Sequence, residues 1–389
     1  MPLPPHLAHL PPPSPEAQAV SNRLAAIIAD DIRSRGGWVS FARYMELALY
    51  APGLGYYSAG SRKFGADGDF ITAPELSPLF GRCLGRQVAE LLEYGVRDVL
   101  EVGAGSGALA ADVLRELDAC GRLPERYLIL EVSADLRERQ RKTLTERAPE
   151  HAGRVQWLDV LPAHLDAVMI ANEVLDAIPA HVVRVQADGV EELGVATAAG
   201  PTFSWSARKA EGDVLASATA LKLPPGQQTE INIAARGFVA SFARLLERGA
   251  LIFVDYGYPA RDFYHPSRAQ GTLMCHYRHH AHGDPFVLVG LQDITAHVDF
   301  TAIAEAAVGS RLDVLGYTTQ ANFLLNCGIT DMLGAVPATD VHAYAPLASQ
   351  AQQLLSPTDM GERFKVIAFG KNIDAPLRGF ASGDKTHQL

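Results

Sequence analysis

Apolar positions recur along this chain with two different periods, and the change of period predicts its elements. Near its start the period is helical, at residues 21–35, 41–49 and 78–92. From residue 98 onwards, short apolar runs that suit strands alternate with helical segments. This alternation predicts an α/β fold with a mainly parallel, Rossmann-like sheet of seven strands and a helical N-terminal region. The apolar face predicted for the first helix consists of Leu24, Ile27, Ile28 and Ile32.

The order of these segments sets the expected topology. The last two strands flank a helical stretch and are predicted to form an antiparallel edge. Ligands of such a sheet bind at the carboxyl ends of its strands. The predicted strands lie at 98–102, 127–132, 154–157, 168–172, 250–256, 311–317 and 364–369, and the helices at 108–119, 134–147 and 233–247.

One segment breaks the alternation between the fourth and fifth strands. Residues 182–203 read as a β-hairpin with its turn at Ala187-Asp188-Gly189, and 205–229 read as irregular. We interpret both as an insertion at about 180–230. The predicted organisation is a disordered lead-in at 1–20, a helical and loop region at 21–95 that helps to form the site, a core at 96–372 and a tail at 373–389.

Composition narrows the class of protein. The 389 residues are 48% hydrophobic and 20% charged, with a formal net charge of −10, which disfavours a nucleic-acid scaffold. No apolar run is long enough for a membrane span. The four cysteines form no C-x-x-C pair, which indicates a reducing compartment and no structural zinc. Residues 1–15 lack Arg and Lys, unlike a signal or transit peptide, so we expect a cytoplasmic bacterial protein, or a mitochondrial matrix protein if the source is eukaryotic.

A glycine-rich turn after the first strand is the most informative motif. Gly103, Gly105 and Gly107 have the spacing G-x-G-x-G, whereas dinucleotide folds use G-x-G-x-x-G. Glu101 lies just upstream, where a carboxylate would repel a pyrophosphate but suits an amino-acid ammonium group. The motif therefore predicts S-adenosyl-L-methionine (SAM) as cofactor and argues against an NAD-dependent dehydrogenase. The alternative is a plain tight turn.

Acids follow the next two strands. Glu131 lies 24 residues past Gly107, and a carboxylate there can accept both hydroxyl groups of a ribose. The alternative is an N-cap for the helix at 134, but Ser133 is the better cap. Asp159 follows the third strand, where it either contacts the adenine amino group or is a solvated loop acid.

The fourth strand ends in Asn172 and Glu173, with Asp176 three residues on. In such a fold this strand end lies nearest the reacting methyl group. Paired carboxylates suit a planar, cationic guanidinium, because they hold it bidentately and stabilise its charge. Glu173 and Asp176, with Glu75, are therefore the catalytic candidates. Alternatively, Asn172 and Glu173 hold only cofactor or backbone.

Three further segments are candidates. Asp255 and Tyr256 end the fifth strand, where an orienting role and a structural role are equally compatible with the sequence. The polar segment 292–300 is a candidate to reach the site. His276, His279, His280 and His282 with Asp284 look like a metal cluster, but their spacing favours a flexible, substrate-facing loop, so we expect no metal.

Several motifs occur together in one order: GDFITAPE at 68–75, EVGAGSG at 101–107, EVS at 131–133, ANE at 171–173, DAIP at 176–179, VDYG at 254–257, DITAHVDF at 293–300 and FKV at 364–366. With these motifs, the chain resembles the MidA-type methyltransferases over residues 40–371. That group includes the mitochondrial complex I assembly methyltransferase.

The resemblance implies a class I SAM-dependent methyltransferase with S-adenosyl-L-homocysteine as product. It also implies symmetric dimethylation of an arginine on a subunit of the respiratory NADH:quinone oxidoreductase, a protein partner, with no nucleic acid and no stable membrane insertion. Val174 and Leu175 stand where mitochondrial relatives carry bulky aromatics. Small-molecule O- or N-methyl transfer, a SAM-binding assembly chaperone without turnover, and a homodimer remain open. The expected cofactor pocket is completed by Thr72, Ala104, Val132 and Val160.

Overall fold

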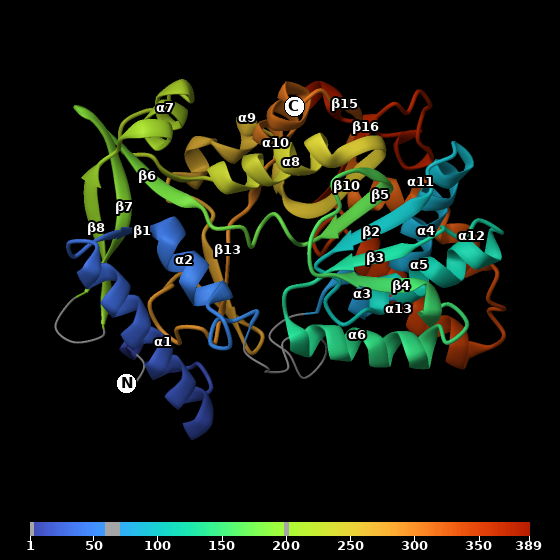
Figure 1. Ribbon diagram of the computed structural model, residues 1–389, viewed down its shortest axis with the longest axis horizontal. Coiled ribbons are helices and arrows are strands. Elements are labelled where there is room, and N and C mark those ends of the chain that lie inside the picture. Colours follow the sequence, from blue (N-terminus) through green and yellow to red (C-terminus); the bar gives the residue numbers. More distant parts are fainter. Residues whose placement is uncertain (1–3, 59–70, 198–201) are drawn as a thin grey trace. The chain divides into compact units, whose positions relative to one another are not determined.

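The computed structural model describes residues 4–58, 71–197 and 202–389, and the contacts within the chain divide it into two units (Figure 1). The first unit combines three stretches of sequence, Met1–Phe70, Asp176–Arg236 and Arg261–His297. The second combines Ile71–Leu175, Gly237–Ala260 and Val298–Leu389. Within the described ranges, no helix is both long and apolar enough to cross a membrane.

The second unit contains the predicted sheet. Its order is β15-β16-β10-β5-β2-β3-β4, and β14 also pairs with β10. The pairs from β10 to β4 are parallel, whereas β16 is antiparallel to both β10 and β15. The mainly parallel sheet with an antiparallel edge is therefore confirmed. Its strands are β2 (Asp98–Val102), β3 (Tyr127–Leu130), β4 (Val155–Leu158), β5 (Leu165–Asn172), β10 (Leu246–Tyr258), β14 (Val298–Asp299), β15 (Asp313–Thr319) and β16 (Phe364–Lys371).

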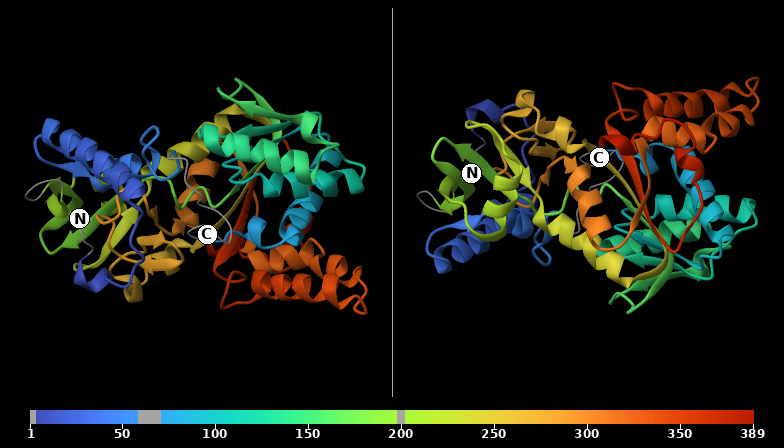
Figure 2. Two further views of the ribbon diagram at one scale, coloured as in Figure 1. Left: turned by 90° about the horizontal axis from the view of Figure 1, so that it is seen from below. Right: turned by 90° about the horizontal axis from the view of Figure 1, so that it is seen from above.

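Helices cover this sheet and form one large core with it. The helices α11, α12 and α13 pack together, as both views in Figure 2 show. The segment 373–389, expected as a tail, contributes buried Leu377 and Phe380 to the same core. The helices are α3 (Ala73–Leu76), α4 (Pro78–Glu93), α5 (Ala108–Ala119), α6 (Ala134–Arg147), α10 (Phe300–Gly309), α11 (Gln320–Asn326), α12 (Ile329–Gly334) and α13 (Val341–Leu355), with short 3-10 helices at Ala152–Arg154, Arg378–Phe380 and Thr386–Gln388, while α8 (Ile233–Leu245) crosses the boundary between the units.

Two glycines on α4 allow α5 to pack closely against it. An added Cβ on Gly81 would lie 2.6 Å from Cβ of Asp112, and one on Gly85 would lie 2.9 Å from Cβ of Glu116. Arg82 and Arg86 of α4 pair with the same Glu116 at 2.7 and 3.0 Å. This close contact fixes α5, and with it the glycine-rich turn that precedes α5.

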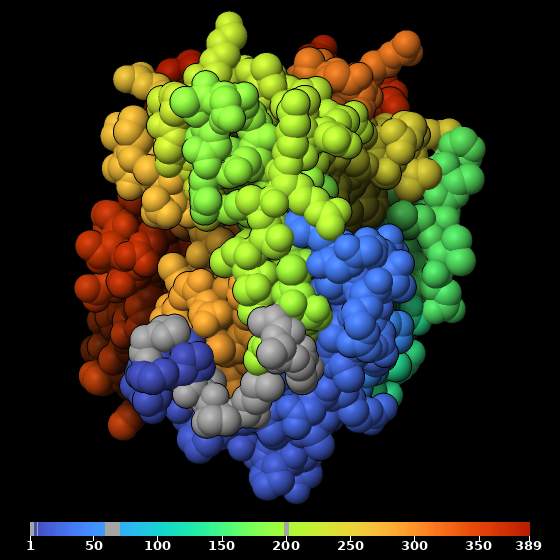
Figure 3. Space-filling view, turned by 90° about the vertical axis from the view of Figure 1, so that its left-hand side faces the viewer, coloured from blue at the N-terminus to red at the C-terminus, as the bar shows by residue number. Residues whose placement is uncertain are grey.

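The first unit joins the N-terminal helices to the predicted insertion. Its main sheet has the order β1-β7-β6-β9, with β8 also paired to β7, and a smaller sheet has the order β12-β11-β13. On the face drawn in Figure 3, N-terminal residues in blue lie beside insertion residues in yellow-green. The elements are α1 (Pro15–Ser34), β1 (Val39–Ser40), α2 (Phe41–Tyr50), β6 (His181–Gln186), β7 (Gly189–Thr197), β8 (Phe203–Lys209), α7 (Gly212–Ala220), β9 (Gln228–Ile231), α9 (Ala260–Phe263), β11 (Met274–Tyr277), β12 (His280–His282) and β13 (Asp293–Thr295), with 3-10 helices at Pro5–Leu7 and Pro266–Arg268.

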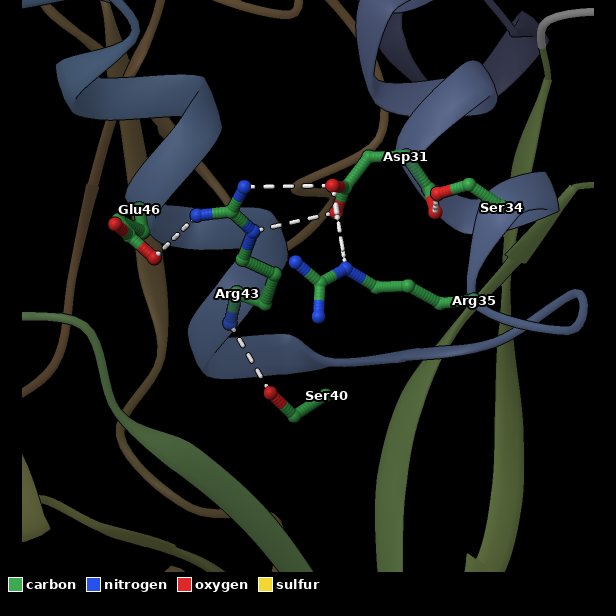
Figure 4. A network of polar contacts seen from close by, with 6 residues as sticks. All are labelled: Asp31, Ser34, Arg35, Ser40, Arg43 and Glu46. Carbon is green, nitrogen blue, oxygen red and sulfur yellow. Dashed lines mark hydrogen bonds and ion pairs between the residues drawn. The ribbon is translucent and has the colours of Figure 1, made fainter.

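An ion-pair network holds α1 and α2 together (Figure 4). Arg43 on α2 donates to Asp31 on α1 at 3.2 Å and to Glu46 at 2.9 Å. Arg35 also donates to Asp31 at 3.2 Å. Burial acts to raise the pKa of Asp31, but its bonds to the two arginines outweigh burial, so that pKa lies below its usual value.

Three expectations about this unit are wrong. Residues 205–229 are not irregular, because they form β8, α7 and β9. The strand β8 pairs with the preceding β7, and β9 pairs with β6, which is distant in sequence. The lead-in is not disordered throughout, because the Ser14 side chain caps a helix that begins at Pro15. In the preceding turn, Leu7 and Leu10 are buried in a cluster with residues near 280. Finally, Ile27 is 46% exposed rather than part of the buried face of α1.

Candidate functional site

The glycine-rich turn joins β2 to α5 with positive φ angles, which residues with side chains rarely adopt. Gly107, the N-cap of α5, has φ +87°, and an added Cβ would lie 3.0 Å from Cα of Gln140 on α6. Gly103 has φ +70°, and its amide donates to the Leu130 carbonyl of β3 at 3.0 Å. The turn therefore lies tightly against its neighbours, and only small residues leave its backbone open to a ligand. Ala104, within it, is buried.

Glu101 is a buried carboxyl group on β2, just before this turn. Only 2% of the residue is exposed, and Tyr127 on β3 donates its hydroxyl to Oε2 at 2.6 Å. Burial raises the pKa of Glu101 to about 7, and the charge of Glu131 adds to the effect, although the Tyr127 bond opposes it. Glu101 can therefore gain or lose its proton near neutral pH.

Glu131 follows β3 and is also buried, but each of its oxygens has a polar partner. Oε1 accepts from the Ser133 amide at 2.9 Å, and Oε2 accepts from Nε2 of Gln140 at 3.1 Å. The N-cap of α6 is Ser133, whose hydroxyl accepts from the Leu136 amide, so Glu131 is not the capping residue. Since a carboxylate has about four lone-pair sites, both oxygens of Glu131 can accept a further hydroxyl group.

Two exposed valines follow the ends of neighbouring strands. Val132 is 78% exposed after β3, and Val160 is 79% exposed after β4. Exposed apolar groups beside a glycine-rich turn can cover a flat apolar ligand. The Asp159 side chain is 85% exposed and pairs with Arg137 at 2.6 Å.

The segment after β5 has a strained backbone. Glu173 has φ +52°, which is uncommon for a residue with a side chain and costs about 1 kcal/mol or more. The Glu173 amide donates to the Val254 carbonyl at 2.9 Å, and Asn172 Nδ2 donates to Glu173 Oε1 at 3.0 Å. Asp255 of β10, also buried, accepts from the Leu175 amide at 2.9 Å. These bonds hold Glu173 at the carboxyl end of β5.

The Asp255→Ala variant is expected to unfold at lower urea concentration, by about 1–3 kcal/mol in the free energy of unfolding. The substitution leaves the buried amide of Leu175 and the half-buried amide of Tyr256 without the carboxylate oxygens that now accept from them at 2.9 Å each. Urea denaturation followed by circular dichroism measures this change. A variant as stable as the parent would show that Asp255 does not hold this turn.

Glu75 lies against the glycine-rich turn. It belongs to the short helix α3, whose N-cap is Thr72, and it accepts a hydrogen bond from the Ser106 hydroxyl. Thr72 is buried, and its carbonyl accepts from the Glu75 amide at 3.0 Å. Residues 68–70 of the same motif lie outside the described residues. The Glu75 side chain is therefore bonded to the glycine-rich turn.

Asp176, three positions after Glu173, begins the second of the three stretches that make up the first unit. It is buried, and its carbonyl accepts from the Ala296 amide at 3.0 Å. Asp293 in the same segment accepts from the Tyr57 hydroxyl at 3.0 Å. The segment 292–300, a candidate from the sequence, thus contacts the residues that follow Glu173 in the chain.

The histidine-rich segment is a hairpin rather than a flexible loop. His276 lies on β11 and His282 on β12, and the two strands pair. Among the residues that the structure describes, no group of three or more His, Cys, Asp or Glu residues is placed to hold a metal ion.

Sequence reasoning missed three side chains of this site. Tyr127, Ser106 and Gln140 hydrogen-bond to Glu101, Glu75 and Glu131, respectively. A tyrosine in an apolar strand, a serine among glycines and a glutamine in a polar helix are common in any fold. No signal in a single sequence distinguishes them.

Known proteins resemble this chain over most of its length. A model of the family described as "Putative S-adenosyl-L-methionine-dependent methyltransferase" matches residues 83–318. The chain is 30% identical over 362 residues to the protein arginine methyltransferase NDUFAF7, mitochondrial, of Danio rerio, covering 85% of this chain and 83% of that protein. It is 28% identical over 422 residues to the Caenorhabditis elegans NDUFAF7 homolog, covering 97% and 95%. A crystal structure of a Burkholderia thailandensis protein bound to S-adenosyl-homocysteine matches with a TM-score of 0.95 at 51% identity, covering 98% of this chain and 100% of that one.

The residues at this edge of the sheet fit the cofactor of the matching family. The turn at 103–107 leaves backbone open, Glu101 is an acid for an ammonium group, and Glu131 retains acceptor sites for two hydroxyls. The exposed Val132 and Val160 can cover an adenine ring. All four features lie in the second unit, at the carboxyl ends of β2, β3 and β4.

Proposed function

Because the chain belongs to the family of S-adenosyl-L-methionine-dependent methyltransferases, with a class I fold and SAM as its cofactor, we propose that it methylates an arginine side chain. The proposed substrate is a subunit of the respiratory NADH:quinone oxidoreductase. The animal relatives, which are named protein arginine methyltransferases and are about 30% identical, support arginine as the acceptor. The observation that carries the proposal is Glu173, an acid held in a strained conformation where β5 ends.

On the cofactor side, each residue has one role. The backbone of Gly103, Gly105 and Gly107 approaches the methionine part, and the ionised Glu101 attracts its ammonium group. Glu131 accepts from the ribose hydroxyls. The adenine ring is bound by Val132 and Val160, with Asp159 at its amino group, and the site is completed by Thr72, Ala104 and Asn172.

On the acceptor side, the segment that follows β5 orients the guanidinium. SAM supplies a methyl group on a positively charged sulfur. The Glu173 carboxylate accepts N–H bonds from the guanidinium and takes up the proton that the methylated nitrogen releases. Asp176 supplies the second carboxylate of the proposed pair, and Glu75 acts from α3, where it is bonded to Ser106.

Labelling with the purified protein tests this function. The protein is incubated with methyl-labelled SAM and a lysate of cells that lack their own copy, and labelled bands are sequenced. Label on one arginine of a respiratory-complex subunit is the expected result. Label only in small molecules would replace the proposal by small-molecule methyl transfer. SAM binding without any label would replace it by a chaperone that binds SAM without turnover.

A further inference from the structure

A single glutamine on α6 joins three parts of the cofactor site. Gln140 is fully buried, and its Nε2 donates to the Gly105 carbonyl at 3.0 Å and to Glu131 Oε2 at 3.1 Å. Its Oε1 accepts from the indole Nε1 of Trp157, on β4, at 2.8 Å. The glycine-rich turn, the acid after β3 and the adjacent strand β4 therefore meet at one amide.

The partners of this amide fix its orientation. A backbone carbonyl can only accept a hydrogen bond, and an indole N–H can only donate one. The NH₂ group of Gln140 must then face Gly105, and its oxygen must face Trp157. In this orientation the second proton of the NH₂ group is available to Glu131 when that acid is ionised. A methionine of the same length could make none of these three bonds.

We propose that Gln140 is a positioning residue for cofactor binding, which holds the glycine-rich turn and the Glu131 carboxylate at a fixed separation. The proposal rests on the cofactor part of the proposed function and is independent of the methyl acceptor. Gln140 leaves one side of the carboxylate oxygen free, so it orients Glu131 without occupying all of its acceptor sites. Burial raises the pKa of Glu131, whereas the hydrogen bond from Gln140 favours the ionised carboxylate and lowers that pKa.

The packing of α6 supports the same role. The α6 backbone at Gln140 approaches the turn so closely that an added Cβ on Gly107 would lie 3.0 Å from Cα of Gln140. The side chain and backbone of one residue thus contact both Gly105 and Gly107. A shift of Gln140 would move the turn that binds the methionine part and the acid that binds the ribose.

The Gln140→Met variant tests the proposal by calorimetric titration with two ligands. Because two bonds to the cofactor-binding groups are lost, we expect the dissociation constant for S-adenosyl-homocysteine to rise about tenfold or more. Methylthioadenosine has the nucleoside but no amino-acid part, so it depends on Glu131 and not on the turn. Its dissociation constant should rise by a smaller factor, about threefold.

A second glutamine provides a matched control. Gln87 on α4 is also fully buried, and it donates to Glu90 at 2.8 Å and accepts from the Gly379 amide at 2.7 Å. The Gln87→Met variant should lose a similar amount of stability and bind both ligands within about twofold of the parent. A purely structural role for Gln140 would make the two variants alike in binding.

A double-mutant cycle tests the link to Glu131. If Gln140 acts partly through this acid, Gln140→Met and Glu131→Gln should weaken S-adenosyl-homocysteine binding by less together than the product of their separate effects. Fully multiplicative effects, or parent-like binding by Gln140→Met, would overturn the proposal. Because every measurement here is of ligand binding, failure to find a methylated arginine would not affect the proposal for Gln140.

Discussion

The Glu173→Gln variant is expected to bind SAM like the parent and to lose methyl transfer by about a hundredfold to a thousandfold. The amide has the shape of the carboxylate, and its oxygen can still accept from Asn172 Nδ2, which now donates to Glu173 at 3.0 Å. What it lacks is the negative charge that holds a guanidinium and the site that accepts the released proton. The measurement is the single-turnover rate with labelled SAM, together with the dissociation constant of S-adenosyl-homocysteine.

Two further variants make the Glu173 result specific. Glu93→Gln removes the charge of an exposed acid at the end of α4, which pairs with Arg122. This variant should leave the rate of methyl transfer unchanged. Glu173→Gly removes the carboxylate and also relieves the strain at φ +52°, so it should be inactive yet up to about 1 kcal/mol more stable than the parent. A parent-like rate in Glu173→Gln would exclude the carboxylate from the chemistry.

The expected opposition of stability and activity at Glu173 is typical of strained functional residues. A glycine would adopt a φ of +52° at lower free-energy cost. The strain at Glu173 therefore lowers the stability of the fold, and other interactions offset this loss. Part of that compensation is visible in the bonds from the Glu173 amide to Val254 and from the Leu175 amide to Asp255. These bonds therefore hold Glu173 at the carboxyl end of β5, where we propose that its carboxylate binds the guanidinium.

The sheet of the second unit was predictable because its strands and helices are local patterns. The helix predicted at 108–119 has the bounds of α5, since a run of apolar and small residues begins at the αL glycine Gly107. The antiparallel edge was also predictable, because two short apolar runs flank the last helices of the chain. Such features depend on period and on neighbours in sequence.

The first unit was not predictable in the same way. It gathers three separate stretches of chain, and its sheet pairs β7 with β1 from the N-terminal region and β6 with the distant β9. No local period encodes such pairings. Likewise, the strand-end acids Glu101 and Glu131 stood out by position, whereas Gln140 and Tyr127 contact Gly105 and Glu101, which are far from them in sequence.

The Glu101→Gln variant is expected to be more stable than the parent in the absence of ligand at pH 8, yet to bind SAM about tenfold or more weakly. Burial raises the pKa of Glu101 from 4.5 to about 7, so between these values the folded chain binds a proton that the unfolded chain releases. The free energy of unfolding therefore falls as the pH rises through this window, by about 3 kcal/mol in total. A neutral amide removes this loss.

Binding has the opposite pH dependence. The ionised Glu101 attracts the ammonium group of SAM, so affinity should rise with pH through about 7 in the parent and stay nearly flat in Glu101→Gln. Tyr127→Phe removes the hydroxyl that donates to Glu101 at 2.6 Å and favours its ionised form. Its SAM affinity should therefore rise only at higher pH than in the parent. Calorimetric titration from pH 5.5 to about 8.5 measures all three profiles, and identical profiles would exclude Glu101 as the group that binds the ammonium.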